Sequence, residues 1–139
     1  MIEYVAGLLY NEAGDYVALI EKQKPEWQKG KLNAIGGKVE PGENPQDAMQ
    51  REFLEETGVD IAAWQYRFTL EREGVYAVHF FSHYSSLIHD VKTIEEEKVG
   101  VYATFLLPIN LIPNLKWIIP ILNDHTIEIP KKIYDIAGN

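Results

Sequence analysis

The chain has 139 residues, the usual size of one domain, and its 46% hydrophobic and 12% aromatic content indicates a globular protein rather than a disordered one. It has no cysteine, which excludes a disulfide framework, a thiolate metal site and a cysteine nucleophile. The formal net charge of −8 argues against attraction to nucleic acid polymers or anionic membranes. We therefore expect a single domain over residues 1–139, with no nucleic acid polymer and no membrane as partner.

The N-terminal segment and the apolar runs bear on localisation. The first ten residues have no basic stretch followed by a long apolar run, so we expect no signal peptide. No apolar run approaches the ~18 residues that are needed to span a bilayer. Together with the absence of cysteine, these features predict a cytoplasmic protein.

The first third of the chain predicts two strands and a helix. Residues 4–10 and 16–21 read as strands joined by a turn, and the polar, lysine-rich residues 22–34 read as a long loop. A helix is predicted over residues 45–57. Its signals are Asn44 as N-cap, Pro45 at the first position, Asp47 at the third and Gly58 as the C-terminal stop.

The rest of the chain predicts further strands and a second helix. The predicted strands cover about 64–72, 75–84 and 99–105, with Gly74 in a turn and one more short strand in the tail, about 126–136. Leucines and isoleucines between 111 and 122 fall on one helical face. Pro113 suits the first turn of that helix, and Pro120 is expected to kink it or end it early. Strands interleaved with helices predict an α/β (α+β) fold with a mixed sheet packed between helices.

Three glutamates on the first predicted helix carry the functional argument. Glu52, Glu55 and Glu56 are spaced i, i+3 and i+4, so they share one helix face, where like charges are destabilising. A hard divalent cation such as Mg²⁺ would offset this repulsion and would share its remaining positions with water and phosphate. The alternative is a solvated acidic face, which is common on helices.

Neighbouring residues favour the metal site over the solvated face. Arg51 precedes Glu52 and could steady it through a charge-assisted hydrogen bond. Gly36 and Gly37 allow a close approach of the loop backbone, so that a main-chain carbonyl could join the metal shell. Glu43 lies just before the helix.

The segment over residues 37–59 resembles the Nudix box, Gly-x5-Glu-x7-Arg-Glu-U-x-Glu-Glu-x-Gly-U, where U is a bulky aliphatic residue. The single departure is Phe53 at the first U position, which keeps the apolar character. The residues in register are Gly37, Glu43, Arg51, Glu52, Glu55, Glu56, Gly58 and Val59.

The resemblance implies a fold, a chemistry and a set of roles. Nudix enzymes have an α/β/α sandwich around a mixed sheet, and they hydrolyse nucleoside diphosphates linked to another moiety with Mg²⁺ or Mn²⁺. By position, Glu52, Glu55 and Glu56 would be metal ligands, joined by the carbonyl of Gly37. Arg51 would orient Glu52, and Glu43 would support the box.

The family often takes a further acidic residue from outside the box. The run Glu95-Glu96-Glu97 precedes the strand predicted at 99–105. We select Glu96 as a further metal ligand and Glu97 as a catalytic residue, although a solvated loop is an equal alternative for any one of the three.

The substrate is predicted from the residues before the box. Residues 32–40 resemble the mutator-type (MutT-like) branch, which cleaves oxidised purine triphosphates and in which an Asn contacts the base. Asn33 stands at that place, but Leu32 replaces the usual Trp, and Asn33 could equally cap the loop. Asn114 is a second base-reading candidate, or an ordinary helix start, and Lys38 is a candidate for phosphate.

Three functions are therefore compared. The leading one is hydrolysis of a nucleoside triphosphate, or an oxidised purine triphosphate, to a monophosphate and pyrophosphate. The second keeps the chemistry but acts on a nucleotide sugar or a dinucleoside polyphosphate. The third is a non-catalytic nucleotide-sensing module, which would be expected to lack box glutamates. The protein is expected to be a monomer or a homodimer.

Overall fold

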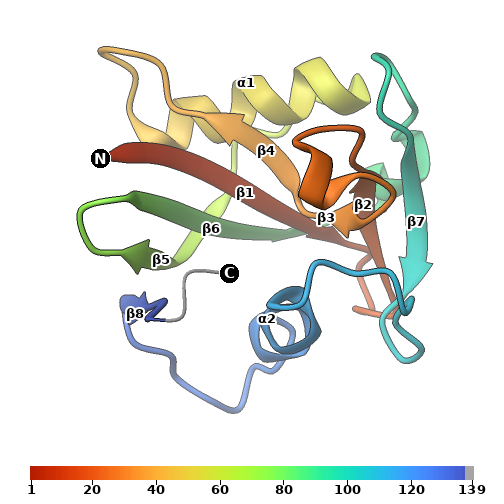
Figure 1. The fold of residues 1–139 in the computed structure, drawn as a ribbon. Coiled ribbons are helices and arrows are strands. Elements are labelled where there is room, and N and C mark those ends of the chain that lie inside the picture. The colour runs from red at the N-terminus through yellow and green to blue at the C-terminus, as the bar shows by residue number, and fades with distance from the viewer. Residues whose placement is uncertain (137–139) are drawn as a thin grey trace.

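A mixed β-sheet with one α-helix on each face forms the framework in this computed structural model, which describes residues 1–136 (Figure 1). The helices are α1 (Pro45–Thr57) and α2 (Leu115–Leu122), and short 3-10 turns lie at Glu26–Gln28 and Ser86–Asp90. The strands are β1 (Ile2–Tyr10), β2 (Tyr16–Glu21), β3 (Leu32–Asn33), β4 (Ile35–Lys38), β5 (Gln65–Arg72), β6 (Tyr76–Tyr84), β7 (Val99–Ala103) and β8 (Lys132–Tyr134).

The sheet is organised around β1. Its strands follow the order β3-β2-β1-β6-β5-β8, while β4 pairs with β1 and β7 pairs with β2. The pairs β1–β6 and β5–β8 are parallel and the others are antiparallel. Strands β2 and β4 pair with different ends of β1, β2 at Tyr10 and β4 at residues 4–7, so both lie on the side of β1 opposite β6.

Each face of the sheet has its own apolar core. On one face Phe68, Phe80 and Leu8 pack with the buried side of α2. On the other face Val5 and Phe81 pack with the buried side of α1. The predicted sandwich with a mixed sheet between helices is therefore confirmed. Neither helix within residues 1–136 combines the length and apolar character that a membrane span requires.

Helix α1 has the bounds that its capping residues predict. The side-chain oxygen of Asn44 accepts a hydrogen bond from the backbone N–H of Asp47 at 2.9 Å. Gly58 ends the helix in the left-handed region, with φ of 78° and its N–H bonded to the carbonyl of Leu54. Phe53 is fully buried, with its ring centroid 5.0 Å from that of Trp64, and this fixes which face of α1 points to solvent.

Helix α2 differs from its prediction at both ends. It begins at Leu115, so Pro113 precedes it rather than lying in its first turn, and it runs through Pro120 to Leu122 instead of ending early. The carbonyl that loses a partner to Pro120 belongs to the exposed Lys116, where water can bond to it.

The sheet supplies donors to the last turn of α2. The hydroxyl of Tyr10 donates to the carbonyl of Ile119 at 2.7 Å, and Arg67 donates to the carbonyl of Leu122 at 2.8 Å. These bonds satisfy carbonyls that a helix end otherwise leaves without a partner.

Two strands were not predicted. The loop expected at 22–34 holds the 3-10 turn at Glu26–Gln28 and ends in β3, and β4 follows at once. The strand predicted at 99–105 ends at Ala103, and the predicted tail strand is confirmed as the short β8.

Candidate active site

Strand β4 and helix α1 bring the two halves of the box together. Strand β4 pairs with β1, so that Gly36 lies opposite Ala6 and Gly37 opposite Val5. A Cβ atom on Gly36 would lie 1.9 Å from the carbonyl oxygen of Val5, and one on Gly37 would lie 2.5 Å from a carboxylate oxygen of Glu52. Glycine at both positions therefore allows β4 to touch the β1 backbone on one side and the Glu52 carboxylate on the other.

Arg51 connects the loop before α1 to the acidic face of the helix. Its Nε and Nη2 donate to the two carboxylate oxygens of Glu43 at 2.8 and 2.9 Å. Its Nη1 donates to Glu52 at 2.9 Å and lies 3.4 Å from Glu55, while Nη2 also donates to the carbonyl of Lys38 at 3.1 Å. One guanidinium group thus fixes Glu43, Glu52 and the end of β4.

The three helix carboxylates differ in their surroundings. The side chain of Glu55 is half exposed, whereas Glu52 and Glu56 are more enclosed. Burial raises the pKa of Glu52, although the hydrogen bond and charge of Arg51 oppose the rise. The pKa of Glu56 is raised to about 7, first by burial and then by the negative charge of Glu95. The positive charge of Lys22 lowers this pKa, and the charges of Glu97 and Glu52 raise it further. Three carboxylates, those of Glu95, Glu97 and Glu52, therefore act on Glu56 against the one ammonium group of Lys22.

The loop before β7 supplies that extra negative charge. Glu97 accepts hydrogen bonds from Lys22 Nζ at 2.8 Å and from the backbone N–H of Gln23 at 2.5 Å. Burial acts to raise the pKa of Glu97, but the bonds from Gln23 and Lys22 hold it below its usual value. Of the two predicted acids, Glu97 lies close enough to act on Glu56, and Glu96 is exposed. Glu95, which was not selected from the sequence, also acts on Glu56.

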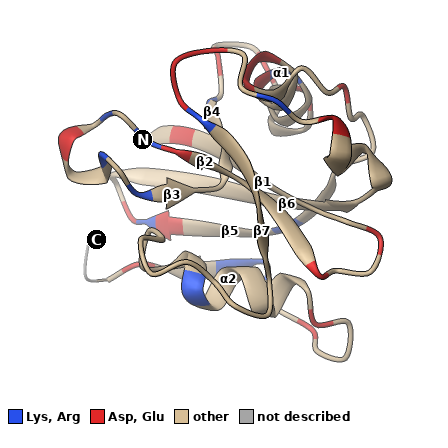
Figure 2. Cartoon of the chain, turned by 90° about the vertical axis from the view of Figure 1, so that its right-hand side faces the viewer, with Lys and Arg blue, Asp and Glu red and all other residues tan. Residues whose placement is uncertain are grey.

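The donor set fits a divalent cation in its chemistry. Among residues 1–136, no three Asp, Glu or His side chains converge closely enough to hold a metal ion. Cationic side chains bond two of the carboxylates at this site: Arg51 bonds Glu52, and Lys22 bonds Glu97. Carboxylate oxygens are nevertheless the ligands that Mg²⁺ prefers, and such an ion would offset the repulsion among these carboxylates. Figure 2 shows acidic residues on α1 and on the loop that leads into β7.

Asn33 has local partners for both of its side-chain polar atoms. Its Oδ1 accepts from the N–H of Ala34 at 2.8 Å, and its Nδ2 donates to Gln28 Oε1 at 3.0 Å. The amide retains one hydrogen and one lone pair for a ligand. The structure therefore gives Asn33 a loop-fixing role, and base reading remains a prediction.

Asn114 lies immediately before α2, beside a groove on the α2 face of the sheet. Within the described chain, its side chain makes no capping hydrogen bond to that helix. The groove has a volume of about 260 Å³ and is lined by Leu70, Trp117 and Ile133 as well as Asn114. Leu32 forms a bridge with Leu111, which brings the segments that carry Asn33 and Asn114 side by side.

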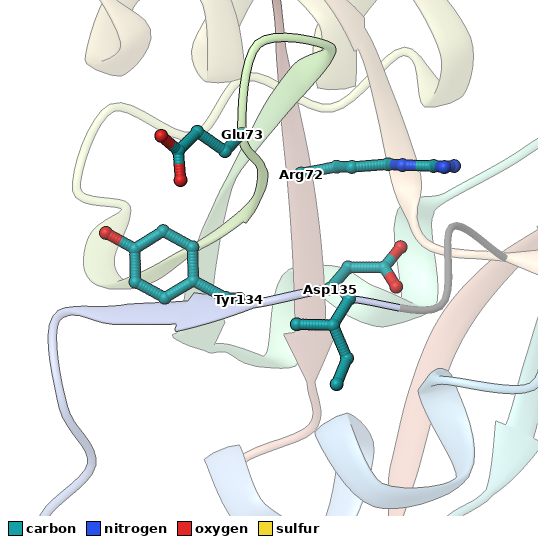
Figure 3. Close-up of a pocket in the computed structure, with 5 residues that line it drawn as sticks. Arg72, Glu73, Tyr134 and Asp135 are labelled. Atoms are coloured by element: carbon teal, nitrogen blue, oxygen red, sulfur yellow. The ribbon is translucent and has the colours of Figure 1, made fainter.

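A second surface hollow, of about 370 Å³, lies beyond β5 and away from the box. Figure 3 shows Glu73 and Tyr134 extending to one side of it and Arg72 to the other. It adjoins the Asn114 groove, because Tyr134 and Asp135 line both. Phe68 and Phe80 do not line either hollow, because they stack on each other in the buried core.

Lys38 contributes its backbone to the site. Its carbonyl accepts the hydrogen bond from Arg51, while its side chain is exposed at the end of β4. Its predicted contact with phosphate stays a prediction.

Comparison with known proteins identifies relatives of this arrangement. The CTP pyrophosphohydrolase of Escherichia coli (strain K12) is 34% identical over 73 residues, which is 52% of this chain and 53% of that protein. The chain thus matches about half the length of this curated relative. Two solved structures share the fold at 23% identity. The MutT protein from Methanosarcina mazei Go1 has a TM-score of 0.70, covering 88% of this chain and 92% of that one. A MutT structure from work on Aliivibrio salmonicida and Vibrio cholerae has a TM-score of 0.67, covering 86% and 96%.

The family model described as NUDIX domain matches residues 3–115, which run from β1 through the box to the start of α2. This match covers most of the chain and includes every residue of the box. The chain therefore belongs to the NUDIX domain family.

Proposed function

We propose that this protein is a Mg²⁺-dependent (or Mn²⁺-dependent) pyrophosphohydrolase that converts a nucleoside triphosphate, or an oxidised purine triphosphate, to a monophosphate and pyrophosphate. In this reaction a water oxygen bonds to phosphorus and a phosphoanhydride P–O bond breaks. The observation that carries the proposal is the carboxylate face of α1, where Gly37 lies close to the Glu52 carboxylate, Arg51 bonds that carboxylate, and the charge of Glu97 acts on Glu56.

The metal would be held by carboxylates from two parts of the chain. Glu52, Glu55 and Glu56 would bind it with the carbonyl of Gly37, and Glu96 is the further ligand predicted from the sequence. When bound, the metal would neutralise phosphate charge and lower the pKa of a coordinated water.

The other residues of the site act by positioning. Arg51 would hold Glu52 in place against Gly37, and Glu43 would hold Arg51 through its two-point ion pair. Glu97 is proposed to act in catalysis. Its bond to Lys22 would have to be exchanged before it could contact water or substrate, and the released Lys22 would then be free to meet a phosphate.

Substrate recognition would fall to residues on the α2 face of the sheet. Asn114, with an amide that is not used for capping, and Trp117, with an exposed aromatic ring, line one groove and could bond and stack a nucleobase. Asn33 would assist from the neighbouring segment, and Lys38 would contact phosphate. The likeness to a CTP pyrophosphohydrolase supports a nucleotide substrate.

A screen of substrates tests this proposal against its alternatives. Ordinary nucleoside triphosphates, 8-oxo-dGTP, a nucleotide sugar and a dinucleoside polyphosphate would be incubated with and without Mg²⁺. Metal-dependent pyrophosphate release from a triphosphate supports the proposal. Turnover of only the nucleotide sugar or the dinucleoside compound would show that the substrate is of that class and not a nucleoside triphosphate. Binding without turnover of any compound would favour the nucleotide-sensing module.

A further inference from the structure

Strand β7 has one edge whose backbone groups are not used by the sheet. Lys98 and Thr104 bond to β2 through their backbone, since Glu21 N–H donates to Lys98 and Thr104 N–H donates to Asp15. Backbone groups alternate in direction along a strand, so those of residues 99, 101 and 103 point away from β2. In the described part of the chain, β2 is the strand that pairs with β7, and no other strand does so.

The free part of this edge is short and well defined. The N–H of Val99 donates to Thr93 Oγ1 at 3.0 Å, which closes the edge at its N-terminal end. Within residues 1–136, no hydrogen-bond partner is found for the backbone groups of Val101 and Ala103 on the outer side. These two residues therefore present unpaired donors and acceptors to the surroundings.

Strand β7 and the segment that follows it carry no charged residue. Residues 99–115 contain no Asp, Glu, Lys or Arg, in a chain of which 24% is charged. In Figure 2, β7 faces the viewer and carries no Lys, Arg, Asp or Glu along its length. The exposed fractions are 45% for Val101, which lies in β7, and 74% and 78% for Phe105 and Leu106, which follow it. Edge strands are normally protected by charged residues or proline, and this edge carries neither at its two outward positions.

We propose that the free edge of β7 pairs antiparallel with the same edge of a second copy of this chain, giving a two-fold symmetric dimer. The net charge of −8 makes most surfaces of two copies repel each other, whereas β7 and the residues just after it carry no charge to repel. An uncharged apolar face with open backbone groups is matched by another of the same kind, and a second copy supplies one.

Charge also selects the antiparallel arrangement. The acidic run at 95–97 lies just before β7, and the uncharged Phe105 and Leu106 lie just after it. Parallel pairing would place the two acidic runs side by side. Antiparallel pairing places each acidic run beside the uncharged end of the other strand, and the two runs are then separated by roughly 30 Å, from a rise of ~3.4 Å per residue, which exceeds the screening length of about 10 Å.

The unpaired groups fix the register. Val101 and Ala103 are the residues with free outward groups. Val101 of one copy would therefore form two backbone hydrogen bonds with Ala103 of the other copy, and Ala103 of the first copy would do the same with Val101 of the second. Tyr102 then faces Tyr102 of the second copy across the two-fold axis, as a pair without hydrogen bonds whose Cα atoms lie ~4.5 Å apart.

The mass in solution tests whether the dimer forms through β7. Light scattering coupled to size exclusion should give twice the 15.9 kDa mass of one chain for the wild type. Val101→Lys should reduce the mass to that of one chain, with an unchanged far-UV circular dichroism spectrum. Val75→Lys is the matched control, because Val75 is 49% exposed and lies in the turn before β6, and it should remain dimeric. A monomeric wild type, which would leave the edge open for a different protein, or a dimeric Val101→Lys variant overturns the proposal.

A single cysteine tests the register. Because the natural chain has no cysteine, Tyr102→Cys introduces one thiol, at a Cα separation that a disulfide accepts. Mild oxidation should cross-link the folded variant into a dimer that reductant dissolves, while Glu73→Cys, in the turn between β5 and β6, should stay uncross-linked. If Tyr102→Cys is folded and dimeric but does not cross-link, the proposed pairing is wrong.

Discussion

Arg51 and Glu43 form a two-point ion pair, with Nε–Oε2 and Nη2–Oε1 distances of 2.8 and 2.9 Å. The pair spans the loop–helix junction, and the remaining nitrogen of Arg51 is left to bond Glu52. Glu43 thus acts on Glu52, the proposed metal ligand, through Arg51. The geometry explains why the two residues stand eight positions apart, one before the helix and one on its second turn.

Replacing Arg51 by lysine keeps the charge but removes the planar fork. An ammonium group cannot bond both oxygens of Glu43 and also reach Glu52, so Glu52 would lose its orientation. We expect kcat/KM for the triphosphate to fall roughly 10- to 100-fold, the range typical for residues that orient metal ligands. Arg72→Lys, a matched change in β5, should leave kcat/KM unchanged. Equal activity of the Arg51→Lys variant and the wild type would remove Arg51 from the site.

The ion pair also predicts how stability depends on pH. The hydrogen bond from Arg51, followed by that from the N–H of Glu40, lowers the pKa of Glu43 from 4.5 to about 2. A carboxyl group with a lower pKa in the folded state stabilises the fold fully above its unfolded pKa, and this contribution disappears as pH falls through the folded value.

Glu43→Gln removes this contribution. Urea unfolding of the metal-free protein should show a constant difference in stability between wild type and Glu43→Gln above about pH 5. The difference should shrink as the pH falls from 4.5 toward 2. A difference that stays the same across this range would show that the carboxylate charge of Glu43 does not stabilise the fold.

The adjacent glycines of β4 should give different phenotypes when changed to alanine. Gly36→Ala places a methyl group against the rigid β1 backbone, so its main effect should be a lower melting temperature. Gly37→Ala meets only the end of the Glu52 side chain, so it should lower metal affinity and activity while the melting temperature changes less. Isothermal titration with Mn²⁺ and thermal unfolding of both variants check this, and equal loss of stability in both would contradict it.

Tyr10→Phe tests how the sheet holds the end of α2. The change leaves the buried carbonyl of Ile119 without its donor, which we expect to cost about 1–3 kcal/mol of unfolding free energy. Tyr16→Phe, at a residue that is 43% exposed, should cost much less. Denaturant unfolding of the two variants measures both values, and equal stabilities would mean that the Tyr10 bond contributes nothing measurable.

Alanine substitutions of Asn33 and Asn114 should distinguish a role in substrate recognition from a role in stability. Asn114→Ala should raise KM for the preferred triphosphate with little change in melting temperature, because its amide makes no capping bond to α2 within the described chain. Asn33→Ala should lower the melting temperature as well, since it breaks bonds to Ala34 and Gln28. Unchanged KM in both variants would place base recognition elsewhere.

The sequence predicts best where local chemistry decides the structure. The bounds of α1 follow from Asn44, Pro45 and Gly58, because capping and helix-stop signals act within a few residues. The Arg51–Glu52 contact was also expected, since neighbouring positions and the box motif define it.

The features that the sequence did not predict depend on distant partners. Strand β4 is Ile-Gly-Gly-Lys, which has no alternating pattern, and it is a strand because β1 pairs with it. Helix α2 continues past Pro120, while Tyr10 and Arg67, far away in sequence, bond the carbonyls at its end. Likewise, the position of Glu95 beside Glu56 depends on how the loop before β7 packs, which local sequence does not encode.

In the proposed reaction, carboxylates of α1 hold the metal that drives phosphoanhydride cleavage. The most direct measurement is the rate of pyrophosphate release from the preferred nucleoside triphosphate as Mg²⁺ is titrated, for the wild type, Glu52→Gln and the control Glu73→Gln. We expect no release without metal, saturable release for the wild type and the control, and a rate at least ~10-fold lower for Glu52→Gln. Release that needs no metal, or a Glu52→Gln variant as active as the wild type at every Mg²⁺ concentration, would contradict the proposal.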